Sequence, residues 1–142
     1  MRAYHVTVDH LFVKPPDRIF AHLSEHENLA KVFGAKVTRI KDGDDGNRNG
    51  VGSVRKLQIG PAPPFEETVT EFDPPHRIAY RITRGSPLRG HLGVMTFAPE
   101  GSGTRFHYDI RLASPVPGLA AIVRASLTRS INKSLPDVDR DA

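Results

Sequence analysis

Hydrophobic and polar residues alternate over several short stretches of this chain, which is the pattern of β-strands that bury one face. The most regular stretch spans residues 104–112, in which Phe106, Tyr108, Ile110 and Leu112 alternate with charged residues. The glycine and proline residues between such stretches are typical of turns. Further strands are therefore predicted at residues 4–13, 35–41, 51–59, 68–72, 78–82 and 91–97.

Apolar residues occur at helical spacing in two parts of the chain. Residues 17–23 predict one short helix, and Ser24 is expected to cap a second short helix that ends at Gly34. Near the C-terminus, one apolar stripe predicts a long helix, and Pro136 is expected to end it. The stripe consists of Leu119, Val123, Leu127, Ile131 and Leu135.

The predicted order is strand, two short helices, six strands and a long helix. An antiparallel sheet must bury one face, and only the last helix is long enough to cover it. We therefore predict an α+β fold in which a curved antiparallel sheet wraps around the long C-terminal helix. A single domain is expected over residues 1–136, followed by a polar, frayed tail over residues 137–142.

Two of the predicted strands form a hairpin around the Pro74-Pro75 pair, because proline ends a strand and favours a turn. If Phe72 lies opposite Arg77, two carboxylates fall on an otherwise apolar face. Carboxylates are rarely buried without a partner, so this face predicts a cavity wall. A one-residue bulge would instead turn the glutamates to solvent. The expected pairs are Glu71 with Ile78, Val69 with Tyr80, and Glu67 with Ile82.

The net charge of +4 raises the question of an anionic partner. The basic residues are scattered singly, without a basic run or an aromatic-basic motif, so nucleic-acid binding is not expected. No apolar run approaches membrane-spanning length, and the amino terminus lacks the apolar segment of a secretory signal. A cytoplasmic protein without stable membrane insertion is expected.

No motif in the chain predicts a metal site or a cofactor. Cysteine is absent, which excludes disulfides, thiolate catalysis and cysteine-ligated zinc. Residues 22–26 match the zinc-protease pattern of two histidines four apart with a glutamate between them, but Ser24 is expected to interrupt the continuous helix that such a site needs. The acidic residues 42–46 are out of phase for a calcium loop and predict a turn.

Taken in order, five segments resemble the helix-grip fold of the START and pollen-allergen superfamily. The sequence is most similar to the superfamily's bacterial polyketide cyclase/dehydrase and lipid-transport branch. The segments are residues 12–20 (Phe-Val-Lys-Pro-Pro-Asp-Arg-Ile-Phe), 27–33 (Glu-Asn-Leu-Ala-Lys-Val-Phe), 50–55 (Gly-Val-Gly-Ser-Val-Arg), 67–69 together with 74–80 (Glu-Thr-Val and Pro-Pro-His-Arg-Ile-Ala-Tyr) and 103–106 (Gly-Thr-Arg-Phe).

This resemblance implies an apolar cavity between the sheet and the long helix that holds a lipid-like or polycyclic aromatic ligand. In some relatives the same cavity catalyses aldol-type cyclisation or dehydration. The superfamily shares no common catalytic motif, so the resemblance transfers no active-site residue to this chain.

Candidate ligand-binding residues follow from the inward faces of the predicted strands and from the helix stripe. Pairing Phe97 with Thr104 turns His91 and Met95 inward, opposite Ile110 and Phe106. The candidates are His10, Arg55, Glu67, Val69, Glu71, Ile78, Tyr80, His91, Met95, Phe106, Tyr108, Val123 and Leu127.

Three functions remain open from the sequence, beginning with binding or transport of a hydrophobic small molecule. An enzyme could use His91, Glu67 or Glu71 to move a proton next to a carbonyl, with Tyr80 or Arg55 stabilising the enolate. Without catalysis, the same residues would have structural roles: Glu67 would pair with Arg55, the tyrosines would be core residues and the histidines would lie at the rim of the cavity. The third possibility is a module that binds protein or RNA. Ligand identity and oligomeric state are not predicted.

Overall fold

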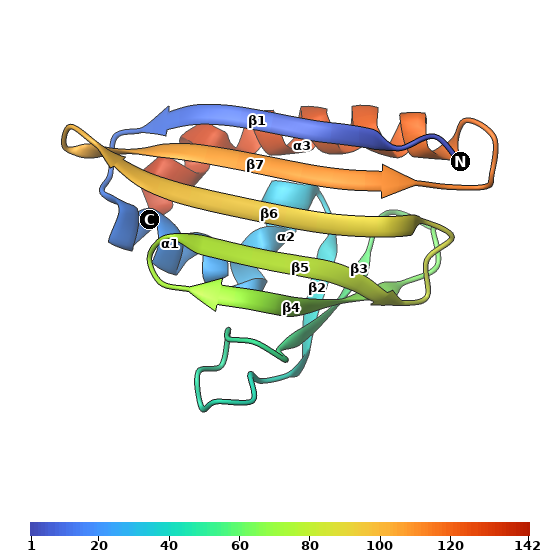
Figure 1. Cartoon of the computed structure of the whole chain (residues 1–142), viewed down its shortest axis with the longest axis horizontal. Helices are drawn as coiled ribbons and strands as arrows, with labels where there is room; N and C mark the ends of the chain where they lie inside the picture. The colour runs from blue at the N-terminus through green and yellow to red at the C-terminus, as the bar shows by residue number, and fades with distance from the viewer.

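A computed structural model describes residues 1–142 and contains one seven-stranded antiparallel sheet. The strands lie in the order β1-β7-β6-β5-β4-β3-β2, so the first strand pairs with the last (Figure 1). Their bounds are β1 Tyr4–Phe12, β2 Lys36–Lys41, β3 Val54–Gln58, β4 Phe65–Asp73, β5 Arg77–Arg84, β6 Arg89–Glu100 and β7 Gly103–Ala113.

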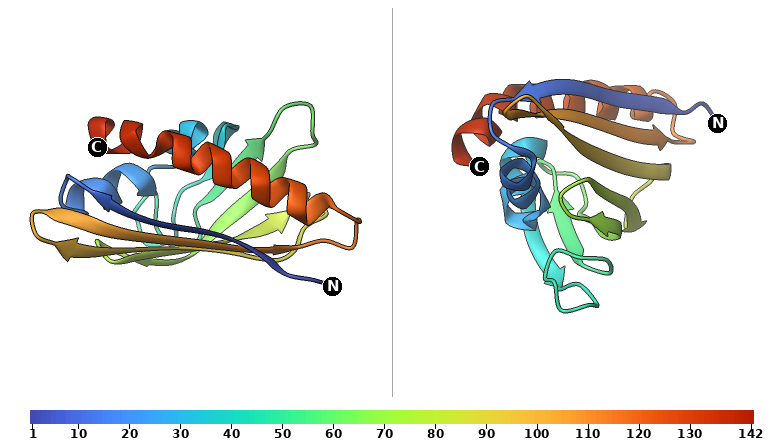
Figure 2. Two further views of the ribbon diagram at one scale, coloured as in Figure 1. Left: turned by 90° about the horizontal axis from the view of Figure 1, so that it is seen from above. Right: turned by 60° about the vertical axis from the view of Figure 1, so that its left-hand side comes forward.

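The helices lie on one side of the sheet. The short ones are α1 (Pro16–Ser24), a 3-10 turn η1 (His26–Asn28) and α2 (Leu29–Phe33), and the long one is α3 (Leu119–Asp141). Figure 2 shows that α3 runs along the face around which the sheet curls, and α3 packs on β1, β7 and α2. The predicted helix-grip fold and its order of elements are confirmed.

The core lies between the sheet and the helices. Alternate residues of β7 supply its centre, because Phe106, Tyr108, Ile110 and Leu112 are almost fully buried. Burying each such side chain contributes about 1.5–3 kcal/mol. At one end, Phe20 of α1 packs against Phe97 with ring centroids 5.1 Å apart. The short helices therefore fill that end of the inner face.

The C-terminal helix does not end at Pro136, contrary to the sequence prediction. It continues to Asp141, because the turn that follows the proline is held by tertiary contacts. Val138 is buried in the core, and the Asp139 carboxylate accepts hydrogen bonds from the backbone N–H groups of Val13 and Lys14, at 2.7 and 3.0 Å. These contacts offset the backbone hydrogen bond that proline cannot make.

Ser24 does not cap the second short helix, which is a second correction. Its hydroxyl donates to the carbonyl of Ala21 within its own helix, at 3.1 Å. The chain then forms the 3-10 turn before α2. Gly34 ends α2 as predicted, with a φ of 62° that favours glycine.

The predicted register of the β4–β5 hairpin is correct over only part of its length. Val69 pairs with Tyr80, and Glu67 pairs with Ile82. A bulge then leaves Thr70 unpaired, so Glu71 lies opposite Ala79 instead of Ile78. Beyond the bulge Glu71 points to solvent.

The β6–β7 pairing is shifted by two residues from the prediction. Phe97 lies opposite Phe106, because both strands continue to a two-residue turn at Gly101 and Ser102. Gly101 has a φ of 59°, which suits such a tight turn. A shift of two residues keeps every side chain on its face, so His91 still points inward.

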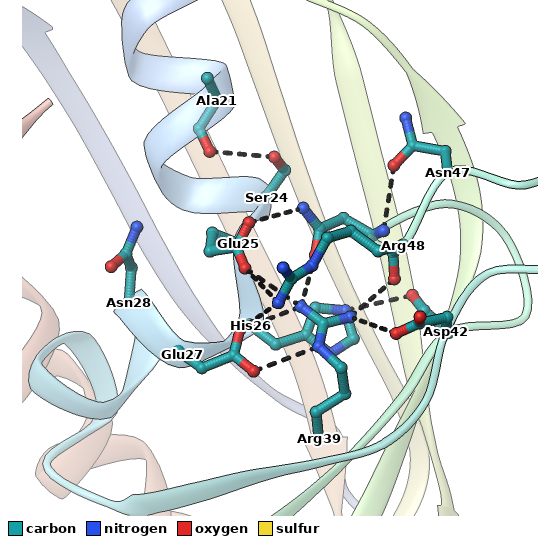
Figure 3. A network of polar contacts seen from close by, with 12 residues as sticks. Ala21, Ser24, Glu25, His26, Glu27, Asn28, Arg39, Asp42, Asn47 and Arg48 are labelled. Carbon is teal, nitrogen blue, oxygen red and sulfur yellow. Dashed lines mark hydrogen bonds and ion pairs between the residues drawn. The ribbon is translucent and has the colours of Figure 1, made fainter.

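A polar network ties the short helices to the sheet (Figure 3). Arg39 of β2 donates to the Glu27 carboxylate of η1 at 2.9 Å and to the side-chain oxygen of Asn49 at 2.7 Å. The Arg39 guanidinium, with burial opposing it, lowers the pKa of Glu27 to about 2. The network therefore fixes η1 over the β2 end of the inner face. No helix of the chain is both long and apolar enough to cross a membrane.

Candidate functional site

A cavity of about 480 Å³ lies between the N-terminal half of α3 and the sheet. Twenty residues line it, and 13 of them are hydrophobic, so its walls are mainly apolar. The apolar wall includes Phe33, Leu57, Ile59, Phe65, Ile82, Ile110, Leu119, Val123 and Leu127.

The mouth of the cavity is formed by two loops and by α3. Pro63 comes from the β3–β4 loop, Pro87 from the β5–β6 loop and Ile122 from the helix, and all three are exposed. Ile122 is 68% exposed. An apolar rim thus leads into an apolar interior.

Five of the residues predicted from the sequence line this cavity, namely Glu67, Tyr80, His91, Val123 and Leu127. Five others are buried in the core away from it, namely Val69, Ile78, Met95, Phe106 and Tyr108.

The three remaining predicted residues also lie outside the lining. Arg55 is buried but is not part of the cavity wall. His10 lies half-buried on β1 and packs edge-on against Phe12, with ring centroids 4.6 Å apart. Glu71 is exposed and accepts a hydrogen bond from Arg77 at 2.7 Å.

The five core residues lie outside the lining because the cavity occupies only one end of the inner face, whereas the bulge at Thr70 turns Glu71 to solvent. Side chains of α1 and the core aromatics fill the other end, around Phe20 and Phe97. Alternation along the strands could have identified Leu57, Ile82 and Ile110 as lining residues. No pattern in the sequence marks the loop residues at the mouth.

Glu67 of the cavity wall forms a buried ion pair with Arg55, which lies behind the wall. Arg55 Nε donates to Glu67 Oε1 at 2.8 Å, and the two side chains are 3% and 6% exposed. They form a directly opposed pair across β3 and β4. The guanidinium carbon also lies 4.6 Å from the centre of the Tyr80 ring, a cation–π contact. The pairing of Glu67 with Arg55 that the sequence allowed is present.

His91 lies beside this pair, and its protonation state follows from its contacts. The backbone N–H of Ile82 donates to His91 Nδ1 at 3.0 Å, so the ring proton of the neutral form is on Nε2. Burial lowers the pKa of His91, opposed by Glu67 and reinforced by Arg55. The ring is therefore neutral at pH 7, and it is buried rather than at the rim.

Two tyrosines complete the polar cluster. The hydroxyls of Tyr80 and Tyr108 are hydrogen-bonded to each other, and burial raises the pKa of both. Both phenols therefore stay protonated. Gly93 makes room for Tyr80, because a Cβ at this position would lie 2.2 Å from the phenol ring. The sequence analysis missed this role of Gly93.

The histidines of the zinc-like pattern do not converge. His26 is fully buried and contacts the Ser53 hydroxyl at 3.1 Å, whereas His22 lies near Asn28. No group of three or more metal-ligating side chains is present. The arrangement of Glu67 and His91 instead places one acceptor and one donor in an apolar cavity, which suits hydrogen bonding or proton transfer to a bound molecule.

Residues 4–141 match the family described as polyketide cyclase/dehydrase and lipid transport. No curated protein matches the chain.

Three solved structures illustrate the fold. The Zhui aromatase/cyclase from Streptomyces sp. R1128 is 19% identical, with a TM-score of 0.74, and the match covers 98% of this chain and 95% of that one. A protein of Thermus thermophilus is 18% identical, with a TM-score of 0.76 and 97% and 98% covered. Truncated norcoclaurine synthase from Thalictrum flavum is 15% identical, with a TM-score of 0.70 and 97% and 91% covered.

Proposed function

Because the chain belongs to the polyketide cyclase/dehydrase and lipid transport family, we propose that it binds a hydrophobic small molecule between α3 and the sheet. The observation that carries this proposal is the cavity of about 480 Å³ with mainly apolar walls. Ligand sites typically measure about 300–1,000 Å³ and combine apolar walls with a few polar groups. Glu67 and His91 are such polar groups.

The route into the cavity also supports binding. Two loops and Ile122 of α3 surround the mouth, so a ligand can enter without unfolding the sheet. An exposed apolar rim lowers the cost of bringing an apolar molecule from water to the interior.

A cavity-filling variant tests the proposal. Val123 lines the cavity and Ala125 is exposed on the same helix, so V123W fills the site and A125W is its matched control. A library of polycyclic aromatics and lipids should contain compounds that raise the melting temperature of the wild type and of A125W. Native mass spectrometry should show one ligand per chain.

The same compounds should have no effect on V123W. Failure of the whole library to bind the wild type, or equal binding by V123W, would overturn the proposal. Circular dichroism checks that both variants are folded.

A second candidate function, proton transfer next to a carbonyl, is favoured by Glu67 and His91 lying together in the wall. One similar structure is that of an aromatase/cyclase. In this reaction the Glu67 carboxylate takes an α-proton, His91 Nε2–H hydrogen-bonds the enolate oxygen, and the protonated Glu67 returns a proton to the carbon. The geometry provides both a base and a donor.

Exchange of the α-protons of 2-tetralone in D₂O, followed by NMR, tests this second function. The wild type should accelerate exchange, and E67Q should lose the acceleration while still binding the ketone. E71Q changes the same residue type on the exposed part of β4 and should exchange like the wild type. If E67Q is as active as E71Q, Glu67 is not the base.

A further inference from the structure

We propose that Glu67 and His91 form a subsite for a ligand hydroxyl, so that the preferred ligand is an uncharged apolar molecule bearing a hydroxyl group. This inference rests on the proposed binding function and narrows it to one ligand class. It follows from three features of the cavity wall, namely a gap between two polar atoms, a fixed histidine tautomer and the absence of lysine and arginine from the lining.

The gap lies between Glu67 Oε2 and His91 Nε2, two polar atoms that make no hydrogen bond within the chain. Glu67 Oε1 is occupied by Arg55, and Oε2 makes no hydrogen bond. His91 Nδ1 is occupied by the Ile82 N–H, and Nε2 makes none. Nε2 and Oε2 are 3.8 Å apart, which is too long for a direct hydrogen bond.

One oxygen atom fits between these two groups. An oxygen about 2.8 Å from both Oε2 and Nε2 makes two good contacts that meet at an angle of about 85°. Both side chains are more than nine-tenths buried and line the cavity, so this position belongs to the cavity interior. A ligand that reaches the wall can supply the oxygen.

The fixed tautomer of His91 selects the type of oxygen. Because Nδ1 accepts from Ile82, Nε2 carries the proton and can only donate, whereas the Glu67 carboxylate can only accept. A hydroxyl oxygen accepts from Nε2–H and donates to Oε2, and so satisfies both. A carbonyl or ether oxygen satisfies only His91, and an ammonium satisfies only Glu67.

The charges around the subsite disfavour anionic head groups. Arg55, the cation in contact with Glu67, is 3% exposed and is not part of the lining; its Nε is paired with that carboxylate, and its Nη2 is buried without a hydrogen-bond partner. A carboxylate or phosphate at the subsite would face Glu67, and no lysine or arginine lines the cavity to balance the two negative charges. The cavity is therefore suited to phenols and alcohols rather than to the acid group of a fatty acid.

Four naphthalene probes separate these possibilities by calorimetric titration at pH 7. They are 2-naphthol, 2-methoxynaphthalene, naphthalene and 2-naphthoate, which share one ring system and differ in the polar group. We expect 2-naphthol to bind at least about tenfold more tightly than the other three, which corresponds to about 1.4 kcal/mol.

Variants should remove this preference selectively. In E67Q, Arg55 Nε retains the amide oxygen as its acceptor, which leaves the NH₂ group at the position of Oε2. The preference for 2-naphthol over 2-methoxynaphthalene should then fall by about tenfold. H91F, which lacks the Nε2 donor, should lose it as well, and E71Q should keep it because Glu71 is exposed.

The outcomes distinguish this inference from the proposed function. If all four probes bind the wild type equally, the hydroxyl subsite is wrong while the binding function stands. If 2-naphthoate binds best, or if E67Q and H91F both keep the wild-type preference, the subsite is also wrong. If no probe binds, the hydroxyl subsite is wrong, and the library titration of the wild type and V123W decides separately whether the proposed function stands. If E67Q does not fold, H91F alone tests the subsite: it should lose the preference for 2-naphthol over 2-methoxynaphthalene, and a retained preference would show that the subsite is wrong.

Discussion

Replacing Arg55 with methionine is expected to lower the free energy of unfolding by about 3–5 kcal/mol. Arg55 and Glu67 are 3% and 6% exposed and are joined by a 2.8 Å hydrogen bond. The variant leaves the Glu67 carboxylate buried without its cation, and the cation–π contact with Tyr80 is lost as well. Methionine fills part of the space that the arginine side chain occupied, so the main loss is electrostatic.

A surface ion pair between β4 and the next strand, β5, serves as the control. Arg77 and Glu71 are joined at 2.7 Å, but their side chains are 42% and 53% exposed. Exposed pairs of this kind contribute about 0–1 kcal/mol, because water screens both charges. The R77M variant should therefore unfold at nearly the same urea concentration as the wild type.

Urea unfolding followed by circular dichroism measures both effects by linear extrapolation. The double variant R55M/E67L should be more stable than R55M alone, because it removes the unpaired carboxylate together with its former partner. If R55M costs no more than R77M, or if the double variant loses the sum of two large single effects, the buried pair is not what holds this wall together.

Three further predictions concern groups outside the ion pair. Burial, reinforced by Arg55, lowers the pKa of His26 from 6.5 to about 3. The native state thus excludes a proton that the unfolded chain binds, so stability is complete above about pH 6.5 and falls by about 1.4 kcal/mol per pH unit below it. In H26Q, the free energy of unfolding in urea should change less with pH between about pH 6 and pH 4 than in the wild type. An unchanged dependence on pH would contradict this. So would an equal change in H107Q, which replaces an exposed histidine. G93A should cost about 1–3 kcal/mol, because its Cβ would overlap the Tyr80 ring, and a wild-type melting curve would disprove that contact. Y108F should cost about 1–3 kcal/mol by leaving the buried Tyr80 hydroxyl without its partner, and a neutral result in urea would mean that this bond contributes little.

Local patterns along the sequence were sufficient to predict the fold. The two-residue alternation in residues 104–112 and the apolar stripe of the last helix predict a sheet and the helix that covers it. Both patterns involve residues close together in the chain. The type of each element is therefore predicted correctly even where its first or last residue is not. Pro136 shows the limit of such rules, because contacts made by Val138 and Asp139 with distant residues keep the helix intact beyond it.

The candidate site could be predicted only in part, because it depends on register. Up to Val69 the expected hairpin pairing was correct, and so Glu67 and Tyr80 do lie in the cavity wall. A single bulge at Thr70 then turned Glu71 to solvent. A bulge places two residues of one strand opposite one residue of its partner, and no residue type in this strand predicts where that happens.

The extent of the cavity was a second limit. The sequence predicts candidates along the whole length of the inner face, but the short helices fill the end near Phe20 and leave the end near Leu57 open. Which end stays open depends on how α1 and α3 pack on the sheet. Such packing is tertiary information that periodicity does not contain.

A crystal structure of the protein with 2-naphthol tests the central claim most directly. The account predicts one ring system in the cavity between Leu57 and Val123, with its oxygen between Glu67 Oε2 and His91 Nε2. A cavity filled by ordered water or by rearranged side chains, with the probe absent or bound only at the outer surface, would contradict it.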